Sequence, residues 1–204
     1  NALDESASIN NKISFKFLLE KVYCEVFELK DFIHMIDHNG ENFYQLANYW
    51  GSFSMVEYAS NFIKERLTQN QLREFFEINS NILHYAFFNE DEKLVPYLAN
   101  FIKSELGIDK LKEMLSGDDD EGRLLFHKAF INQSNTQIIE NFISLYEENF
   151  SFEELKELLC TKKLIHIHLT HTISELCTSF KRFNLKTIES LLKKYCNPLI
   201  LYYF

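Results

Sequence analysis

Apolar residues recur along the chain at the intervals of three and four residues that are typical of one face of an α-helix. One stripe is formed by Met55, Tyr58, Ala59, Phe62 and Ile63. A second stripe repeats this template and consists of Leu94, Tyr97, Leu98, Phe101 and Ile102. Each stripe predicts a helix, and core packing is the simplest interpretation of both.

Three short sequence blocks recur in a fixed order, 39 to 44 residues apart. The first block occupies Phe43–Ala47, Ile82–Ala86 and Leu125–Ala129. The second block occupies Asn61–Lys64, Asn100–Lys103 and Asn141–Ser144. The third block begins at Leu72, Leu111 and Leu155, with an earlier copy at Leu29. Because three blocks keep one order at one period, the sequence predicts a helical repeat.

The third block predicts a short additional helix in each repeat. Asn70, Asp109 and Ser151 are residue types that favour the N-cap position, and they precede this block. Ser151 and Glu154 have the spacing of a capping box. We therefore expect three helices for each repeat.

The first block and its flanks resemble the ankyrin repeat. Asp37–Ala47 followed by Gly51, Met55 and Val56 is similar to the pattern D-x-x-G-x-T-P-L-H-x-A-A, a later Gly and an apolar pair. His84 and His127 stand at the histidine of T-P-L-H, and Asp119 and Gly122 stand at the Asp and Gly. The resemblance implies that these histidines hydrogen-bond the backbone of a turn.

The chain also departs from the ankyrin pattern. Thr and Pro of T-P-L-H are absent from every copy, and Gln45 replaces the histidine in the first. The period exceeds the ankyrin length of about 33 residues, and the third block accounts for the difference. We interpret the chain as a divergent, ankyrin-like array with an extra short helix.

Glycine and alanine positions support this interpretation. Gly40 and Gly122 precede the first helix, where a tight turn needs a positive φ, and Asn79 occupies the equivalent place in the second copy. A small residue recurs within the first helix, namely Ala47, Ala86 and Ala129. We expect it to let neighbouring helices approach closely.

The expected fold is an all-α helical-repeat solenoid of about three to four repeats with an N-terminal half-repeat. The half-repeat covers residues 3–36, because the apolar run from Ile13 to Ile36 is typical of the back half of a repeat. Three-helix repeats are expected over residues 37–160, at about 37–77, 78–117 and 118–160. Residues 161–204 are expected to form a degenerate repeat or cap.

Composition agrees with a helical protein and excludes several function classes. The 204 residues include only 5 Gly and 2 Pro beside 20 Phe, 10 Tyr and 1 Trp, which disfavours a turn-rich β-fold. The net charge of −9 argues against a nucleic-acid partner. We expect no membrane span, and the four unpatterned cysteines favour free thiols in a reducing, intracellular compartment, the cytoplasm or alternatively the nucleus.

Candidate chemistry is sparse. His166, His168 and His171 are the only histidine cluster, and no acidic residue lies within three positions of them. No phosphate-binding loop or nucleophile motif is present in the sequence, and the acidic run Asp118–Glu121 lacks the pattern of a calcium loop. We expect no catalytic residue, no metal and no cofactor.

The remaining candidate is a protein-binding surface. By resemblance to ankyrin repeats, it would combine loop tips with the ends of the first helices and the concave helix face. The expected contact residues are Tyr49, Trp50, Phe88, Asn89, His38, Asn39, Glu41, Asp119, Asp120 and Glu121. Tyr49 and Trp50 are the expected anchors because Trp and Tyr are enriched in interface hot spots; the alternative is that the pair packs against the first half-repeat.

We expect the chain to be a protein–protein interaction scaffold rather than an enzyme. Its acidic charge favours a protein partner with a basic patch, and self-association through the aromatic-rich ends is a further option. Two alternatives stay open. The chain could be a regulatory or targeting domain of a larger enzyme, channel or toxin, or a metal-dependent enzyme that uses the histidine cluster.

Overall fold

The computed structural model of the chain describes residues 2–23, 35–37, 39–89, 91–117, 125 and 136–160. Within these residues every regular element is a helix, which confirms the all-α fold class. The chain divides into two compact units, Asn1–Gly117 and Asp118–Phe204. This boundary lies where the third repeat was expected to begin, whereas the finer division into half-repeat, repeats and cap stays a prediction.

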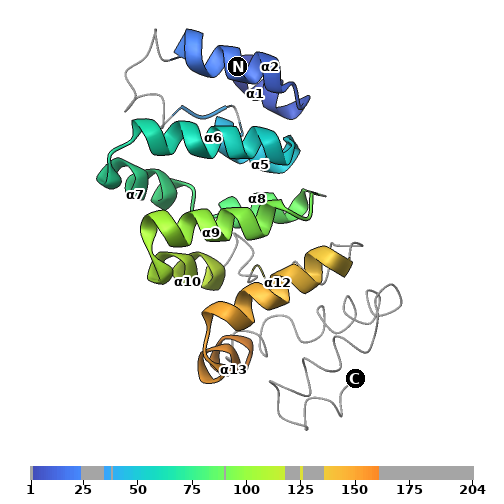
Figure 1. The fold of residues 1–204 in the computed structure, drawn as a ribbon, viewed down its shortest axis with the longest axis vertical. Coiled ribbons are helices and arrows are strands. Elements are labelled where there is room, and N and C mark those ends of the chain that lie inside the picture. Colours follow the sequence, from blue (N-terminus) through green and yellow to red (C-terminus); the bar gives the residue numbers. More distant parts are fainter. Residues whose placement is uncertain are drawn as a thin grey trace. The chain divides into compact units, whose positions relative to one another are not determined.

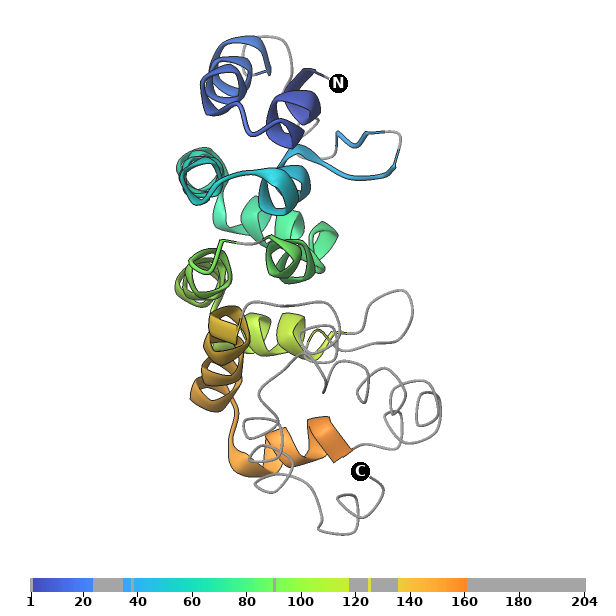
Figure 2. The same ribbon diagram turned by 90° about the vertical axis from the view of Figure 1, so that its right-hand side faces the viewer.

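The first unit contains two columns of helices (Figures 1 and 2). We call one the front column because its helices come first along the chain in each pair of helices; it lies behind the other column in the view of Figure 1 and consists of α1 (Ala2–Ser8), α5 (Phe43–Trp50) and α8 (Ile82–Phe88). The back column consists of α2 (Lys12–Phe17) continued by the π-helix η1 (Leu18–Tyr23), then α6 (Phe53–Arg66) and α9 (Leu94–Leu106). Within the columns, α5 packs against α1 and α8, and α6 packs against α2 and α9. Figure 2 shows α6 and α9 end-on beside the front column.

A third helix follows each of the last two back helices of this unit. These are α7 (Gln69–Ile78) and α10 (Ile108–Ser116). The second unit contains α12 (Thr136–Asn149) and α13 (Phe152–Cys160), which contact each other. Leu72, Leu111 and Leu155 are each the fourth residue of α7, α10 and α13, and all three are buried. The third sequence block therefore marks a helix in every described copy, as expected.

The apolar stripes lie where they were predicted. α6 buries Met55, Ala59, Phe62 and Ile63, while Tyr58 is only half-buried. α9 buries the corresponding residues, and its Tyr97 is likewise half-buried. We call a front helix and the back helix that follows it a layer. Both tyrosines take part in contacts between successive layers: the Tyr58 hydroxyl donates to Glu20 of η1, and the Tyr97 ring centroid lies 5.3 Å from that of Phe53.

Helix starts were only partly predicted. Ser151 and Glu154 form the predicted capping box, with Ser151 N donating to Glu154 at 2.6 Å and Glu154 N donating to Ser151 Oγ at 3.3 Å. The caps predicted at Asn70 and Asp109 are wrong. α7 begins two residues earlier, at a capping box of Thr68 and Gln71, and α10 begins after Gly107, so Asn70 and Asp109 lie in the first turns. Thr68 prevails because Gln71 stands three residues later and returns a bond to its backbone amide.

The N-terminal segment holds a front helix that the sequence analysis did not predict. α1 packs against α5 and buries Ser6 and Ala7. Residues 2–23 thus contribute to both columns, rather than to the back column alone.

Two turn positions behave differently from each other. Gly40 has the predicted positive φ, +82°. Asn79 does not: its φ is −98°, and its side-chain amide instead donates to Phe75 O at 2.7 Å. A side chain that caps the end of α7 removes the need for a left-handed residue there. Gly122 lies outside the described residues.

None of the helices in the described part of the chain is both long and apolar enough to cross a membrane.

Candidate protein-interaction surface

Four aromatic side chains meet where α5 and α8 end. The centroid of the Tyr49 ring lies 4.4 Å from that of the Trp50 ring, in an edge-on arrangement. It lies 6.0 Å from the ring centroids of both Tyr85 and Phe88. We call Tyr49, Trp50, Tyr85 and Phe88 the aromatic cluster. Ring pairs at these separations are favourable beyond their buried area. The cluster therefore joins two neighbouring front helices and holds Tyr49 at its centre.

Trp50 is the exposed member of the aromatic cluster. Its side chain is 54% exposed, whereas Tyr49, Tyr85 and Phe88 are half-buried. The Tyr49 ring contacts Tyr85 and Phe88 of α8. The alternative that the Tyr49–Trp50 pair packs against the first half-repeat stays open. The indole of Trp50 is thus exposed to solvent beside the three half-buried rings of the aromatic cluster.

Asn89 fixes the backbone beneath the cluster. Its side-chain Nδ2 donates to the carbonyl oxygens of Asn48, Tyr49 and Gly51 at 3.1, 3.3 and 2.7 Å. Its Oδ1 accepts a bond from Asp91 N at 3.0 Å. These contacts satisfy carbonyl groups that the end of α5 would otherwise leave without helical partners. Asn89, predicted as a contact residue, therefore has a structural role, and its role toward a partner stays a prediction.

The start of α6 is also tied to both neighbouring layers. Asn10 Oδ1 accepts from Ser52 N at 2.9 Å, and Asp91 Oδ2 accepts from Phe53 N at 3.2 Å. Ile9, beside Asn10 at the end of α1, is 66% exposed. Ile9, Trp50 and Phe88 thus stand at the ends of the three successive front helices.

The loop-tip residues lie at the other end of α5. Asp37 Oδ1 accepts hydrogen bonds from Asn39 N at 2.8 Å and Glu41 N at 3.0 Å, just before the helix begins. α5 has eight residues, which corresponds to a length of about 12 Å. The structure therefore brings Tyr49, Trp50, Phe88 and Asn89 together but keeps them apart from Asn39 and Glu41.

Several predicted residues lie outside the described part of the chain. These are His38, Asp119, Asp120, Glu121, His127, Ala129 and the histidines His166, His168 and His171. Within the part of the chain that is described, no group of three or more His, Cys, Asp or Glu side chains could hold a metal ion.

Sequence reasoning missed Tyr85 and Ile9. Tyr85 precedes Phe88 by three residues, a spacing that places both on one helix face. Phe88 itself is 39 residues after Tyr49, which is the repeat period. Tyr85 was thus recoverable from helical spacing, whereas Ile9 was missed because α1 was not predicted.

Buried amides link the layer of α5 to the next one. Asn42 caps α5, and its Nδ2 donates to Asn79 Oδ1 at 2.8 Å. Gln45 completes the capping box and donates its own amide to Asn81 Oδ1 at 3.0 Å. Gln45, which stands at the ankyrin histidine position, therefore bonds side chains of the following turn. His84 is buried at the equivalent place in α8, and its predicted bond to turn backbone stays a prediction.

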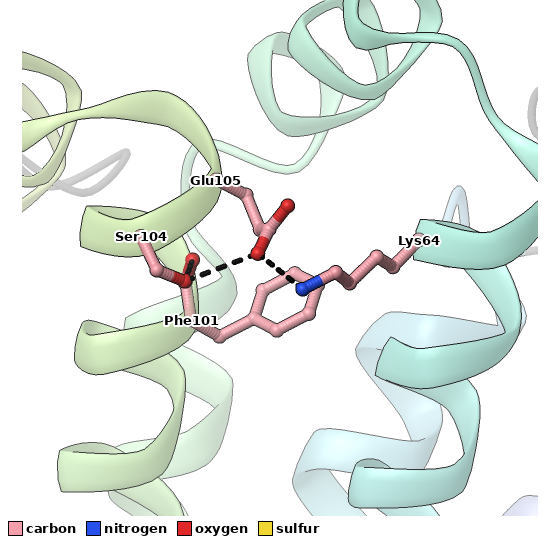
Figure 3. A network of polar contacts seen from close by, with 4 residues as sticks. All are labelled: Lys64, Phe101, Ser104 and Glu105. Carbon is pink, nitrogen blue, oxygen red and sulfur yellow. Dashed lines mark hydrogen bonds and ion pairs between the residues drawn. The ribbon is translucent and has the colours of Figure 1, made fainter.

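The back column has a polar link of its own (Figure 3). Lys64 Nζ on α6 lies 2.6 Å from Glu105 Oε1 on α9, and Ser104 Oγ is 3.2 Å from the same oxygen. The Glu105 side chain is only 11% exposed. Phe101, one turn before Glu105, packs against Phe76 of α7 at 6.0 Å.

Comparison with protein-family models, curated proteins and solved structures gave no match for this chain.

Proposed function

We propose that this chain is a protein-interaction module, built from stacked ankyrin-like helical repeats, and that it binds a protein partner through the aromatic cluster. The stacked helices would serve as the scaffold and Trp50 as the exposed anchor, and the chain would catalyse no reaction.

Contacts between equivalent helices support the stacked arrangement. α5 and α8 are joined by Tyr49 and Tyr85, and α6 and α9 are joined by the Phe53–Tyr97 contact and the Lys64–Glu105 ion pair. The helices that touch are copies of the same sequence block, one period apart. Neighbour-to-neighbour packing of this kind is how repeat proteins build extended binding surfaces.

The exposure of Trp50 is the observation that carries the binding proposal. A side chain of this size is usually buried, and this one is more than half exposed on a base that Asn89 and Tyr49 immobilise. A pre-ordered aromatic side chain loses little entropy on binding, so it can contribute strongly to affinity.

The charge of the first unit indicates the partner's character. Residues 1–117 include 18 acidic and 11 basic side chains. An acidic surface speeds the approach of a basic partner and repels acidic ones. We therefore propose a partner that presents an apolar pocket for Trp50 within a basic surface.

The test compares the wild-type chain with Trp50→Ala and Phe17→Ala in a quantitative pull-down. Phe17 is a matched control because it is 59% exposed and lies on α2, in the back column. For a specific partner we expect Trp50→Ala to lose about 2 kcal/mol of binding free energy, a roughly 30-fold weaker affinity, with no change for Phe17→Ala.

Circular dichroism should show equal helix content in all three proteins. Equal capture by all three, or equal loss in both variants, would count against Trp50 as the anchor.

A further inference from the structure

The turn before α5 contains the sequence Asn39-Gly40, the single Asn-Gly pair in the chain. Both residues are exposed, and Gly40 has a φ of +82°. Gly40 N donates to Asp37 O at 3.2 Å, and Asp37 N donates to Glu41 O at 2.7 Å. Hydrogen bonds between Asp37 and Glu41 therefore close the turn, while its two central residues, Asn39 and Gly40, are exposed.

Asparagine followed by glycine has a specific chemical weakness. The backbone nitrogen after an asparagine can attack the side-chain carbonyl carbon, and a side chain on the following residue hinders this attack. Gly40 has no side chain that could shield the carbonyl carbon of Asn39, and the Asn39 side chain is exposed.

We propose that Asn39 deamidates spontaneously in the folded protein. A bond forms between Gly40 N and Asn39 Cγ, and the Cγ–Nδ2 bond breaks. The proton of Gly40 N leaves with the amide nitrogen as ammonia, which gives a cyclic succinimide. Water then opens the ring at either carbonyl and leaves aspartate or isoaspartate at position 39. The reaction needs only water and involves no oxidation or reduction.

Five other asparagines in the described residues are protected by burial or by a helical backbone. Asn42, Asn48 and Asn79 are buried and have hydrogen-bonded amides. Asn61 and Asn100 are exposed but lie within α6 and α9, and each is followed by Phe. A helical backbone cannot rotate to bring its amide nitrogen onto the preceding side chain without breaking helical hydrogen bonds.

Two contacts restrain the groups that react, the Asn39 side-chain amide and the Gly40 nitrogen. Its Nδ2 lies 3.5 Å from Asp37 Oδ2, and the attacking nitrogen of Gly40 is engaged with Asp37 O. The first contact is exposed and Gly40 itself is an exposed residue. Water can therefore replace these bonds at small cost, since net hydrogen-bond energies at such sites are modest. The restraint slows the reaction but does not block it.

The product would change the turn. A new carboxylate would stand between Asp37 and Glu41, and isoaspartate would route the backbone through the former side chain. Asp37 Oδ1 accepts from both Asn39 N and Glu41 N, so added negative charge beside it opposes this arrangement. We expect the turn before the Asn42 cap to loosen as the protein ages.

The experiment incubates the whole folded chain at neutral and mildly alkaline pH and follows each asparagine by peptide mass mapping. We expect Asn39 to be the first asparagine that converts, with both aspartate and isoaspartate present and a faster rate at higher pH. Asn61 and Asn100 serve as internal controls within the same molecule. An Asn39→Gln variant keeps a side-chain amide but should show no conversion at this position.

A parallel sample that is unfolded in urea shows whether conversion of Asn39 depends on the folded structure or on the local sequence alone. The proposal is overturned if Asn39 stays intact in the folded protein while it converts in urea, if it converts in neither sample, or if Asn61 or Asn100 converts before it. Because the readout is covalent, it does not depend on whether a protein partner exists.

Discussion

The side-chain amide of Asn89 donates a 2.7 Å hydrogen bond to the carbonyl oxygen of Gly51, one layer away in the first unit. The same Nδ2 also reaches the carbonyls of Asn48 and Tyr49. A single side chain thus closes the end of α5 and determines where the aromatic cluster stands. Its removal should affect both stability and the position of Trp50.

Asn89→Ala should lower the free energy of unfolding by about 1–3 kcal/mol, because it leaves part-buried carbonyl groups without a donor. Urea unfolding followed by circular dichroism measures this change. Trp50 fluorescence should shift as well, since Trp50 is the chain's single Trp and stands between Tyr49 and Gly51, whose carbonyls lose their bonds. Asn100→Ala, at an exposed position of α9, is the control and should change neither quantity. Equal stability of the two variants would contradict the role of Asn89.

Ala86 tests the close approach of front helices. It is 1% exposed within α8, which packs against α5. Ala86→Phe should overpack this contact and cost about 1–3 kcal/mol. Thermal unfolding is the measurement, with Ala2→Phe at an exposed position as the matched insertion. Near-wild-type stability of Ala86→Phe would show that the space around Ala86 is not restricted.

The ion pair between Lys64 and Glu105 should contribute modestly to the free energy of unfolding, and this contribution should depend on salt concentration. Lys64→Met leaves the nearly buried Glu105 carboxylate with Ser104 alone, so we expect a loss of about 0.5–1 kcal/mol at low salt. The loss should shrink as ionic strength rises. Lys110→Met breaks the 2.8 Å pair with Glu113 inside α10 and should cost less, because Glu113 is well exposed. The prediction fails if the Lys110 variant is the less stable of the two.

The helices could be predicted because their information is local. The stripe at Met55, Ala59 and Phe62 and the block that begins at Leu72 both depend on spacing alone, and the structure places each on a helix with the expected face buried. The capping box of Ser151 and Glu154 was recognisable for the same reason. Residues three and four apart on a helix are neighbours whatever the rest of the fold does.

The missed features depend on partners that are distant in the sequence. Asn79 was expected to adopt a positive φ, but Asn42, 37 residues earlier, donates a buried hydrogen bond to its Oδ1, and the Asn79 amide itself caps α7. The role of Asn89 toward Gly51 likewise joins residues 38 apart. For the candidate surface, the ankyrin resemblance and the residue types singled out Tyr49 and Trp50, but the exposure of each side chain became known only from the packing of α5 on α8.

Tyr44 and Tyr97 should make the fold sensitive to alkaline pH. Tyr44 is fully buried in α5 and its hydroxyl lies 2.8 Å from Ser60 Oγ, which in turn donates to Val56 O. Burial raises the pKa of the Tyr44 phenol, chiefly because the phenolate would lose its hydration, and burial also raises the pKa of Tyr97.

The direction of the pH effect follows from these shifts. An unfolded chain releases a tyrosine proton near a pKa of about 10, whereas the folded chain keeps it to higher pH. Above that pH the native state therefore binds more protons than the unfolded state, and stability falls as pH rises. Below that pH both states keep the tyrosine proton, so the tyrosines contribute their full stabilisation to the native state.

Tyr44→Phe should cost about 0.5–1.5 kcal/mol at neutral pH, through loss of the bond to Ser60. Above pH about 10, its unfolding free energy should decline less steeply than that of the wild type, by at most about 1.4 kcal/mol per pH unit. Urea unfolding at several pH values gives both slopes, and Tyr97→Phe should show a smaller change of slope because Tyr97 is only half-buried. Parallel declines for wild type and Tyr44→Phe would mean that Tyr44 ionises as readily in the folded chain as in the unfolded one.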